Sequence, residues 1–200
     1  SFQPKWTSVC YGDGKFVAVG AKNSSAEANE AMYSTDGINW TKVILPSVAE
    51  NLTSICYGDG KFVAVTTSSS GSNIAAYSTD GINWTQTELP GSRKWLSVCY
   101  GNGKFVAVCS DALLPAYSTD GITWTSARLP VSAKWYSVCY GNGKFVAVAY
   151  SSNIAAYSTD GINWTQSDLP ADTDWRSVCY GNGKFVAVDS DSNIAAYSTD

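Results

Sequence analysis

Short hydrophobic runs separated by glycine turns follow one another along the whole chain. In residues 95–108, for example, W-L-S-V-C-Y is followed by Gly-Asn-Gly and then by K-F-V-A-V. Asn-Gly and Asp-Gly pairs tolerate the positive φ angles of tight turns, so the two runs are expected to form a β-hairpin. No stretch has the apolar spacing of an amphipathic helix. The pattern therefore predicts an all-β chain.

Two further strands are predicted in each repeat. The run A-A-Y-S at residues 75–78 is expected to be a third strand, and it leads into Thr79-Asp80-Gly81, a second turn sequence. The fourth strand is expected at residues 82–85, and Leu89-Pro90 is expected to close it. Each unit then contains four short antiparallel strands.

The phrase S-[VI]-C-Y recurs five times, and its cysteines lie 46, 43, 40 and 40 residues apart. Four-stranded units of about 40 residues in tandem are typical of β-propeller blades, which stack around a ring and so bury both faces of each sheet. The sequence therefore predicts a single five-bladed β-propeller over residues 1–200, with blades at about 6–46, 52–90, 95–130, 135–170 and 175–200. No G-I-N-W-T follows Asp200, so the last blade is expected to lack its outer strand. A β-solenoid is the alternative, and a single β-sandwich would not need to repeat one phrase.

The second turn is part of a longer phrase, S-T-D-G-I-[NT]-W, which resembles the Asp-box of sialidase-like BNR-repeat propellers. That resemblance implies a turn between the third and fourth strands of a blade, and a secreted or cell-surface protein. Here Gly follows Asp directly, so the turn is one residue shorter than the usual box. We interpret its residues as structural, with the carboxylate accepting backbone hydrogen bonds and the Trp packing under the hairpin. They are Asp36, Trp40, Asp80, Trp84, Asp120, Trp124, Asp160, Trp164 and Asp200.

Composition excludes several classes of partner. The net charge is −4 and charged residues make up 15% of the chain, without a basic cluster that would bind nucleic acid or an anionic membrane. No apolar run approaches the ~18 residues of a membrane span. A single carboxylate per turn is too few oxygen ligands for a metal ion, so no metal and no cofactor are expected. Equivalent cysteines in a ring point the same way round, and we therefore interpret them as small buried apolar residues rather than disulfides.

An enzyme is not predicted. Sialidases, as the resemblance implies, need three arginines that converge on a carboxylate, whereas Arg93, Arg128 and Arg176 occupy three different blade positions. Histidine is absent, so the common nucleophile–base pairs are unavailable. A glycoside hydrolase of sialidase type stays an alternative.

Differences between the five units collect at one end of the predicted blades. They fall after the first Trp of each unit, just past F-V-A-V and at the exit of the fourth strand, whereas both turns are nearly invariant. Antiparallel strands place these variable sites on one face of the ring, and we predict that a ligand binds there. Exposed aromatic, amide and acidic side chains suit sugars, so a glycan is the first candidate ligand. The candidate residues are Arg93, Lys94, Tyr136, Tyr150, Asn153, Arg176, Asp189 and Asn193.

Two other interpretations of this face stay open. Loops tolerate change for no functional reason, and the close similarity of blades three to five also fits a recently duplicated or engineered scaffold without a specific ligand. The outer edge at residues 194–198 has no predicted neighbour. Unpaired strand edges attract other strands, so we expect a homo-oligomer or completion of the blade by another strand.

Overall fold

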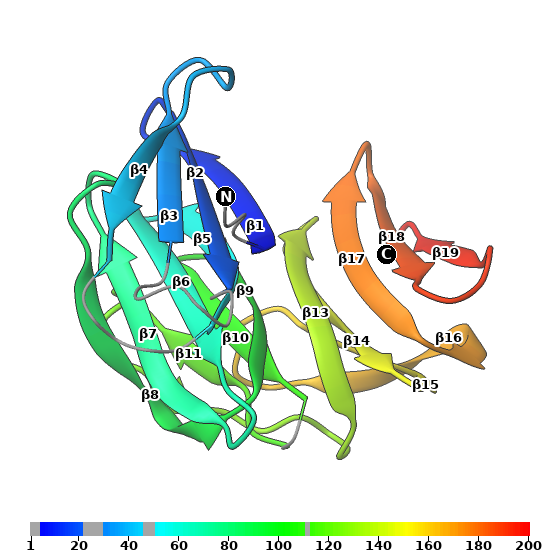
Figure 1. Ribbon diagram of the computed structural model, residues 1–200. Coiled ribbons are helices and arrows are strands. Elements are labelled where there is room, and N and C mark those ends of the chain that lie inside the picture. Colours follow the sequence, from blue (N-terminus) through cyan, green and yellow to red (C-terminus); the bar gives the residue numbers. More distant parts are fainter. Residues whose placement is uncertain (1–4, 22–29, 46–50, 111–112) are drawn as a thin grey trace.

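A computed structural model describes residues 5–21, 30–45, 51–110 and 113–200. Every regular element in this part of the chain is a β-strand, and the strands form five antiparallel sheets, as predicted. Four sheets have four strands and the last has three (Figure 1). In each sheet the strands follow one another in sequence order, which is the arrangement of propeller blades.

The bounds of the strands repeat from blade to blade. Blade 1 contains β1 (Lys5–Gly12), β2 (Lys15–Ala21), β3 (Glu30–Ser34) and β4 (Thr41–Ile44). Blade 2 contains β5 (Asn51–Gly58), β6 (Lys61–Thr67), β7 (Ser72–Ser78) and β8 (Thr85–Arg93). Blade 3 contains β9 (Trp95–Gly101), β10 (Lys104–Cys109), β11 (Ala116–Ser118) and β12 (Thr125–Ser126). Blade 4 contains β13 (Lys134–Gly141), β14 (Lys144–Tyr150), β15 (Ser152–Ser158) and β16 (Thr165–Thr173). Blade 5 contains β17 (Trp175–Gly181), β18 (Lys184–Asp189) and β19 (Ala195–Ser198).

The first hairpin of each blade has the predicted tight turn. In blade 3, Asn102 has φ 45° and Gly103 has φ 70°, and Gly101 pairs directly with Lys104. Two successive positive φ angles match the right-handed twist of the flanking strands, which is why Asn-Gly and Asp-Gly recur here.

The prediction for the fourth strand is wrong at both ends. In blade 2 this strand begins at Thr85, after the Trp, and continues to Arg93, past Leu89-Pro90. The preceding residues stay in the turn because the Asp80 carboxylate accepts hydrogen bonds from the amides of Ile82 and Asn83. Those amides are therefore not available for a sheet ladder.

Neighbouring blades contact each other through the same interactions four times. The innermost strands pack in the order β1, β5, β9, β13, β17. At each contact a Tyr ring covers a Gly of the preceding blade, as Tyr140 covers Gly101, so closely that a Cβ atom there would lie 2.0 Å from the ring. A Ser hydroxyl of the preceding blade also accepts a backbone hydrogen bond, as Ser97 does from Val138 at 3.2 Å. Clusters of buried Val, Ala, Phe and Trp fill the space between the sheets.

The five blades form an open arc, whereas the sequence predicts a closed ring. Strand β17 lies across an opening from β1 (Figure 1), and no comparable packing joins the two. On the β1 side Val9 is 58% and Tyr11 60% exposed, although Val98, the counterpart of Val9 in blade 3, is 4% exposed. On the β17 side nothing in the described chain lies within 4 Å of the Cβ position of Gly181. Each end of the arc therefore presents half of the interface that joins the blades internally.

The open ends also change the prediction for the cysteines. All six are free. Of the five repeated cysteines, Cys56 is buried as predicted and Cys10, Cys99 and Cys139 are half-buried, but Cys179 is exposed because no blade follows its face of β17. Where a blade does follow, burial raises the thiol pKa, and that of Cys10 reaches about 12.

Candidate functional site

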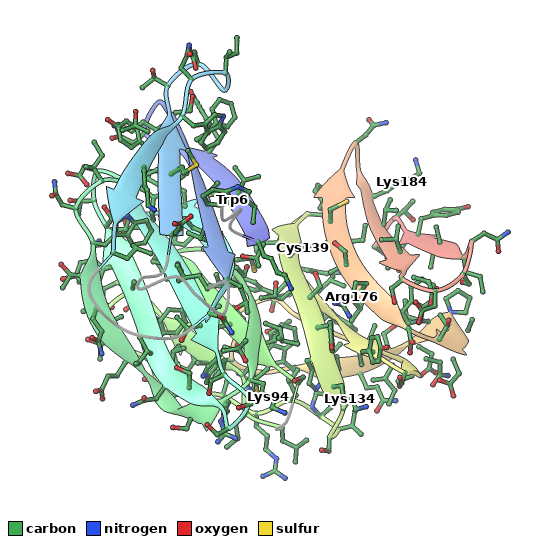
Figure 2. All side chains as sticks on the ribbon, in the orientation of Figure 1. Trp6, Lys94, Lys134, Cys139, Arg176 and Lys184 are labelled. Carbon is green, nitrogen blue, oxygen red and sulfur yellow. The ribbon has the colours of Figure 1, made fainter. Side chains whose placement is uncertain are left out.

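The variable positions lie together at one end of the blades. The strand order places the starts of the first and third strands and the ends of the second and fourth at this end, which we call the variable face. Both invariant turns lie at the other end. In Figure 2, Lys94 and Lys134, which start or precede inner strands, are at the opposite end of the molecule from Lys184, which follows a hairpin turn.

In each blade, the variable residue that follows the first conserved position of the inner strand (Trp, or Leu52 in blade 2) lies in a β-bulge. The pairing register of the inner strand shifts between Trp135 and Ser137 in blade 4 and between Trp175 and Ser177 in blade 5, and the other three blades shift at the same place. A bulge leaves its residue outside the ladder and re-aims its side chain. Tyr136 and Arg176 are the bulged residues of the last two blades, so their side chains take no part in the regular core.

Four side chains of blades 4 and 5 stack in a row on the variable face. Tyr136 and Tyr150 lie with their ring centroids 4.7 Å apart and 27° between their planes. The Arg176 guanidinium covers Tyr136 at 4.8 Å from the ring centroid, and the Lys134 ammonium lies 5.8 Å from that of Tyr150. Cations over aromatic faces are attracted by the ring quadrupole. We call Arg176, Tyr136, Tyr150 and Lys134 the aromatic–cation stack.

Acidic groups border this stack. Ser151 Oγ donates a hydrogen bond to Asp174 at 2.7 Å, which lowers the pKa of that carboxyl, and the nearby Tyr150 lowers it further. The pKa of Asp191 is raised, first of all by the neighbouring Asp174, because two close carboxylates do not both ionise readily. The Thr173 hydroxyl bonds to Asp189 and lowers its pKa to about 2.

The candidate residues from the sequence are only partly assembled. Tyr136, Tyr150 and Arg176 meet directly, and Asp189 belongs to the acidic border. Among the described residues no hydrogen bond, ion pair or ring contact joins Arg93, Asn153 or Asn193 to the stack. Lys94 is exposed between β8 and β9, one blade before Lys134. Sequence reasoning missed Lys134, Ser151, Asp174 and Asp191. The repeat could have indicated two of these four residues, because Lys134 and Asp174 occupy the same repeat position as Lys94, which was already a candidate.

The invariant Asp residues bind their own turns. Asp80 Oδ1 accepts hydrogen bonds from Ser78 Oγ at 2.9 Å, Ile82 N at 2.8 Å and Asn83 N at 2.7 Å, and Oδ2 accepts one from Asn83 Nδ2 at 2.7 Å. The same network surrounds Asp36 and Asp160, and Asp120 has all of it except the bond from an Asn side chain, since Thr123 stands there. Asp200 retains only the Ser198 contact, at 2.7 Å. The carboxylates therefore hold the backbone of the turn in place.

The free energy of unfolding is expected to decrease as the pH falls below about 4, because the Asp carboxylates resist protonation in these folded turns but not in the unfolded chain. The Asn83 amide is the largest factor that lowers the pKa of Asp80 below its ordinary value of 3.8, and the Asn39 side chain does the same for Asp36. A carboxyl with a lowered folded pKa stabilises the fold above its unfolded pKa and loses that contribution as pH falls through the folded value. Thermal unfolding followed from pH 7 to pH 2 should show it. Asp80→Asn should take up about one proton fewer on unfolding in acid, and an identical pH slope in both proteins would contradict this role.

No group of three His, Cys, Asp or Glu side chains in the described ranges is arranged to hold a metal ion. The part of the chain that the structure describes also contains no helix long and apolar enough to cross a membrane.

Comparison with known proteins identifies the fold but no family. No protein-family profile and no curated protein matches the sequence, so the Asp-box resemblance stays a prediction. Solved β-propeller structures match the chain along nearly its whole length. Virginiamycin B lyase of Staphylococcus aureus matches 98% of this chain and 84% of its own at 13% identity, with a TM-score of 0.70. YCF48 bound to a D1 peptide matches 98% of this chain at 16% identity, with a TM-score of 0.70, and this chain covers 63% of it. A nidogen–laminin complex matches 96% of this chain and 74% of its own at 10% identity, with a TM-score of 0.71. At these identities the likeness establishes a β-propeller architecture and nothing finer.

Proposed function

We propose that this chain is a non-enzymatic propeller that binds a polypeptide segment on its variable face, through the aromatic–cation stack and its acidic border. The observation that carries the proposal is the stack itself. Its Tyr136 and Arg176 occupy bulges where the first three blades have Thr7, Thr53 and Leu96, and those blades fold with the same strand order. The fold therefore does not require these large side chains, and Tyr and Arg are the types that dominate binding interfaces.

The chemistry of this surface suits a polypeptide. Two cations and three carboxylates lie within one patch, so a segment with charges of both signs can pair with it. The phenol groups and the carboxylates also bond to backbone amides and carbonyls. Two proteins of the same fold are named with polypeptide partners, YCF48 with a D1 peptide and nidogen with laminin. Their likeness to this chain is one of fold, and it supports the proposal only at that level.

A carbohydrate ligand, the first candidate from the sequence, is the second candidate here. Exposed Tyr, Asp and Ser groups on the same surface favour it. Sugar rings bind proteins by stacking on flat aromatic faces, and in this structure the faces of Tyr136 and Tyr150 cover each other or lie under Arg176 and Lys134. A sugar would first have to displace a cation. We therefore favour a polypeptide over a glycan as the ligand of the variable face.

The non-enzymatic character is part of the proposal. Glycosidases hold two carboxyl groups about 5–9.5 Å apart so that the scissile bond, with or without a water, fits between them. Asp174 and Asp191 instead lie so close together that each alters the pKa of the other. Turnover of fluorogenic glycosides that is lost in Asp191→Asn would overturn this part.

The binding experiment compares two exposed cations at opposite ends of the blades. The purified chain is screened on a peptide array and a glycan array, and the best binder is then titrated. Arg176→Ala is expected to weaken binding at least tenfold, whereas Lys184→Ala should leave the affinity unchanged because Lys184 lies at the invariant end. Equal affinities in the two variants would overturn the proposed site. Glycan binding that free sugar inhibits and Tyr150→Ala abolishes would replace the polypeptide with a carbohydrate.

A further inference from the structure

A groove of about 570 Å³ lies between blades 3 and 4, beside the turn that joins β15 to β16. Leu114 and residues 126–130 of blade 3 form one wall, and residues 162–164 of the turn form the other. Small-molecule sites have volumes of about 300–1,000 Å³. Both blades have a packed neighbour on each side, so the groove belongs to the interior of the arc.

A side-chain contact that joins blades 2 and 3 has no counterpart at this junction. Thr87 Oγ1 of β8 donates a hydrogen bond of 2.6 Å to Ile122 O in the turn of blade 3. Ala127 occupies the repeat position of Thr87, and Ile162 that of Ile122. Alanine has no hydroxyl to donate, so the side chain that spans the earlier junction is replaced here by a methyl group.

The wall on blade 3 is held in place by its backbone. The amides of Ala127 and Leu129 each donate a hydrogen bond of 2.8 Å to carbonyls of residues 113–115, just before β11. Arg128, the residue between them, forms an isolated β-bridge with Asn163 of blade 4. Backbone contacts on both sides therefore fix this segment, and the groove is formed before any ligand arrives.

Arg128 gives the groove a positive charge. Glu88 occupies the same repeat position in blade 2 and Asp168 occupies it in blade 4, so the sign of the charge is reversed in blade 3. Arg128 is exposed, and no acidic side chain is among the described residues that line the groove. An anionic ligand therefore matches this surface.

Asn163 supplies a second donor on the opposite wall. Its Nδ2 donates a hydrogen bond to Asp160 Oδ2 at 2.8 Å, which orients the side chain and uses one of the two amide hydrogens. Guanidinium and amide groups both donate to carboxylate oxygens. Apart from Ser126, Arg128 and Asn163, the lining residues are apolar, and they are Leu114, Ala127, Leu129, Pro130, Ile162 and Trp164.

We propose that this groove binds a small aromatic carboxylate, with the carboxylate on Arg128 and Asn163 and the ring on the apolar lining beside Trp164. The charge of Arg128 selects the anion, and aromatic rings gain from packing on an indole. The groove lies beside an invariant turn rather than on the variable face, so the proposal does not depend on what binds the aromatic–cation stack.

The test uses 2-naphthoate as the probe and 2-naphthamide as a neutral molecule of the same shape. Isothermal titration calorimetry with the full chain is expected to show saturable binding of the naphthoate. The amide should bind about tenfold more weakly, because it lacks the charge-assisted hydrogen bond. Arg128→Gln should weaken naphthoate by a similar factor and leave the amide unchanged. Lys184→Gln, which removes an exposed cation of blade 5, should bind both molecules like the original chain.

Ala127→Thr tests the location of the ligand. This substitution introduces the residue that joins blades 2 and 3, and its hydroxyl is expected to bond to Ile162 O as Thr87 bonds to Ile122 O. The larger side chain would occupy part of the groove, so naphthoate should bind about tenfold more weakly. The thermal midpoint, measured by circular dichroism, should not fall.

Four results would overturn the proposal. They are no saturable binding of naphthoate, equal affinity for naphthoate and naphthamide, equal weakening by Arg128→Gln and Lys184→Gln, and unchanged binding by a folded Ala127→Thr variant. The last result would place the ligand elsewhere on the molecule.

Discussion

Gly101→Ala is expected to lower the free energy of unfolding by about 3 kcal/mol, at the upper end for overpacking. The added Cβ would lie 2.0 Å from Cγ of Tyr140, so either the ring or the whole of blade 4 must move. Gly101 is not among the residues with positive φ, so the cost is steric rather than conformational. Urea denaturation should show a lower midpoint with an unchanged slope.

Gly181→Ala is the matched control. Gly181 occupies the same position in blade 5, but no described atom lies within 4 Å of the added Cβ. The free energy of unfolding should change by only a few tenths of a kcal/mol, or rise slightly, because alanine restricts the unfolded chain. If both variants lost the same stability, Gly181 would have to be covered in solution, and the open arc would be wrong.

Trp135→Ala is expected to cost about 3–5 kcal/mol, the range for removing a large buried aromatic side chain. Trp135 is fully buried at the start of β13, in the cluster that joins blades 3 and 4. Much of this loss should appear as a lower thermal midpoint, measured by circular dichroism. The loss would also loosen the support of Tyr136, the next residue in the chain and a member of the aromatic–cation stack.

Trp6→Ala tests the same repeat position at the open end. Trp6 is 43% exposed, so the substitution removes less buried apolar surface and should cost about 1–2 kcal/mol. Comparing the free energy of unfolding lost in Trp6→Ala with that lost in Trp135→Ala shows whether the β1 face is covered in solution. Equal losses would contradict an exposed β1 face.

The open arc leaves the candidate binding site intact. The aromatic–cation stack spans β13, β14 and β17, and β13 and β14 both pack directly on β17. The opening lies on the other face of blade 5. Closing the arc or extending it would therefore bury Cys179 and Val9 without changing the contact between Arg176 and Tyr136.

Periodicity and turn chemistry allowed most of the fold to be predicted. Hairpins such as that at Asn102-Gly103 depend on the φ preferences of two adjacent residues, so they follow from the local sequence. The fourth strand was misplaced because residues 82–84 look like a strand in isolation. In the structure their amides bond to the Asp80 carboxylate instead. The sequence indicates that this carboxylate accepts backbone hydrogen bonds, but which amides donate them, and are thereby lost to the sheet, is decided only in the folded turn.

The candidate site was predicted in part for a similar reason. Variation between repeats placed Tyr136, Tyr150 and Arg176 on one face, because strand order alone decides which ends of the strands lie together. Their stacking depends on bulges that turn the side chain of one blade toward the next, and on packing between sheets that are distant in sequence.

Local pattern thus sets the strands, the hairpins and the separation of a variable from an invariant face, since each depends on backbone preferences within about 40 residues. Whether the blades close into a ring depends on the angle between successive sheets, which many small contacts such as Tyr140 on Gly101 decide together. The exposed ends of the arc and the aromatic–cation stack both depend on that angle and on which neighbour each blade has. Only the tertiary structure contains this information.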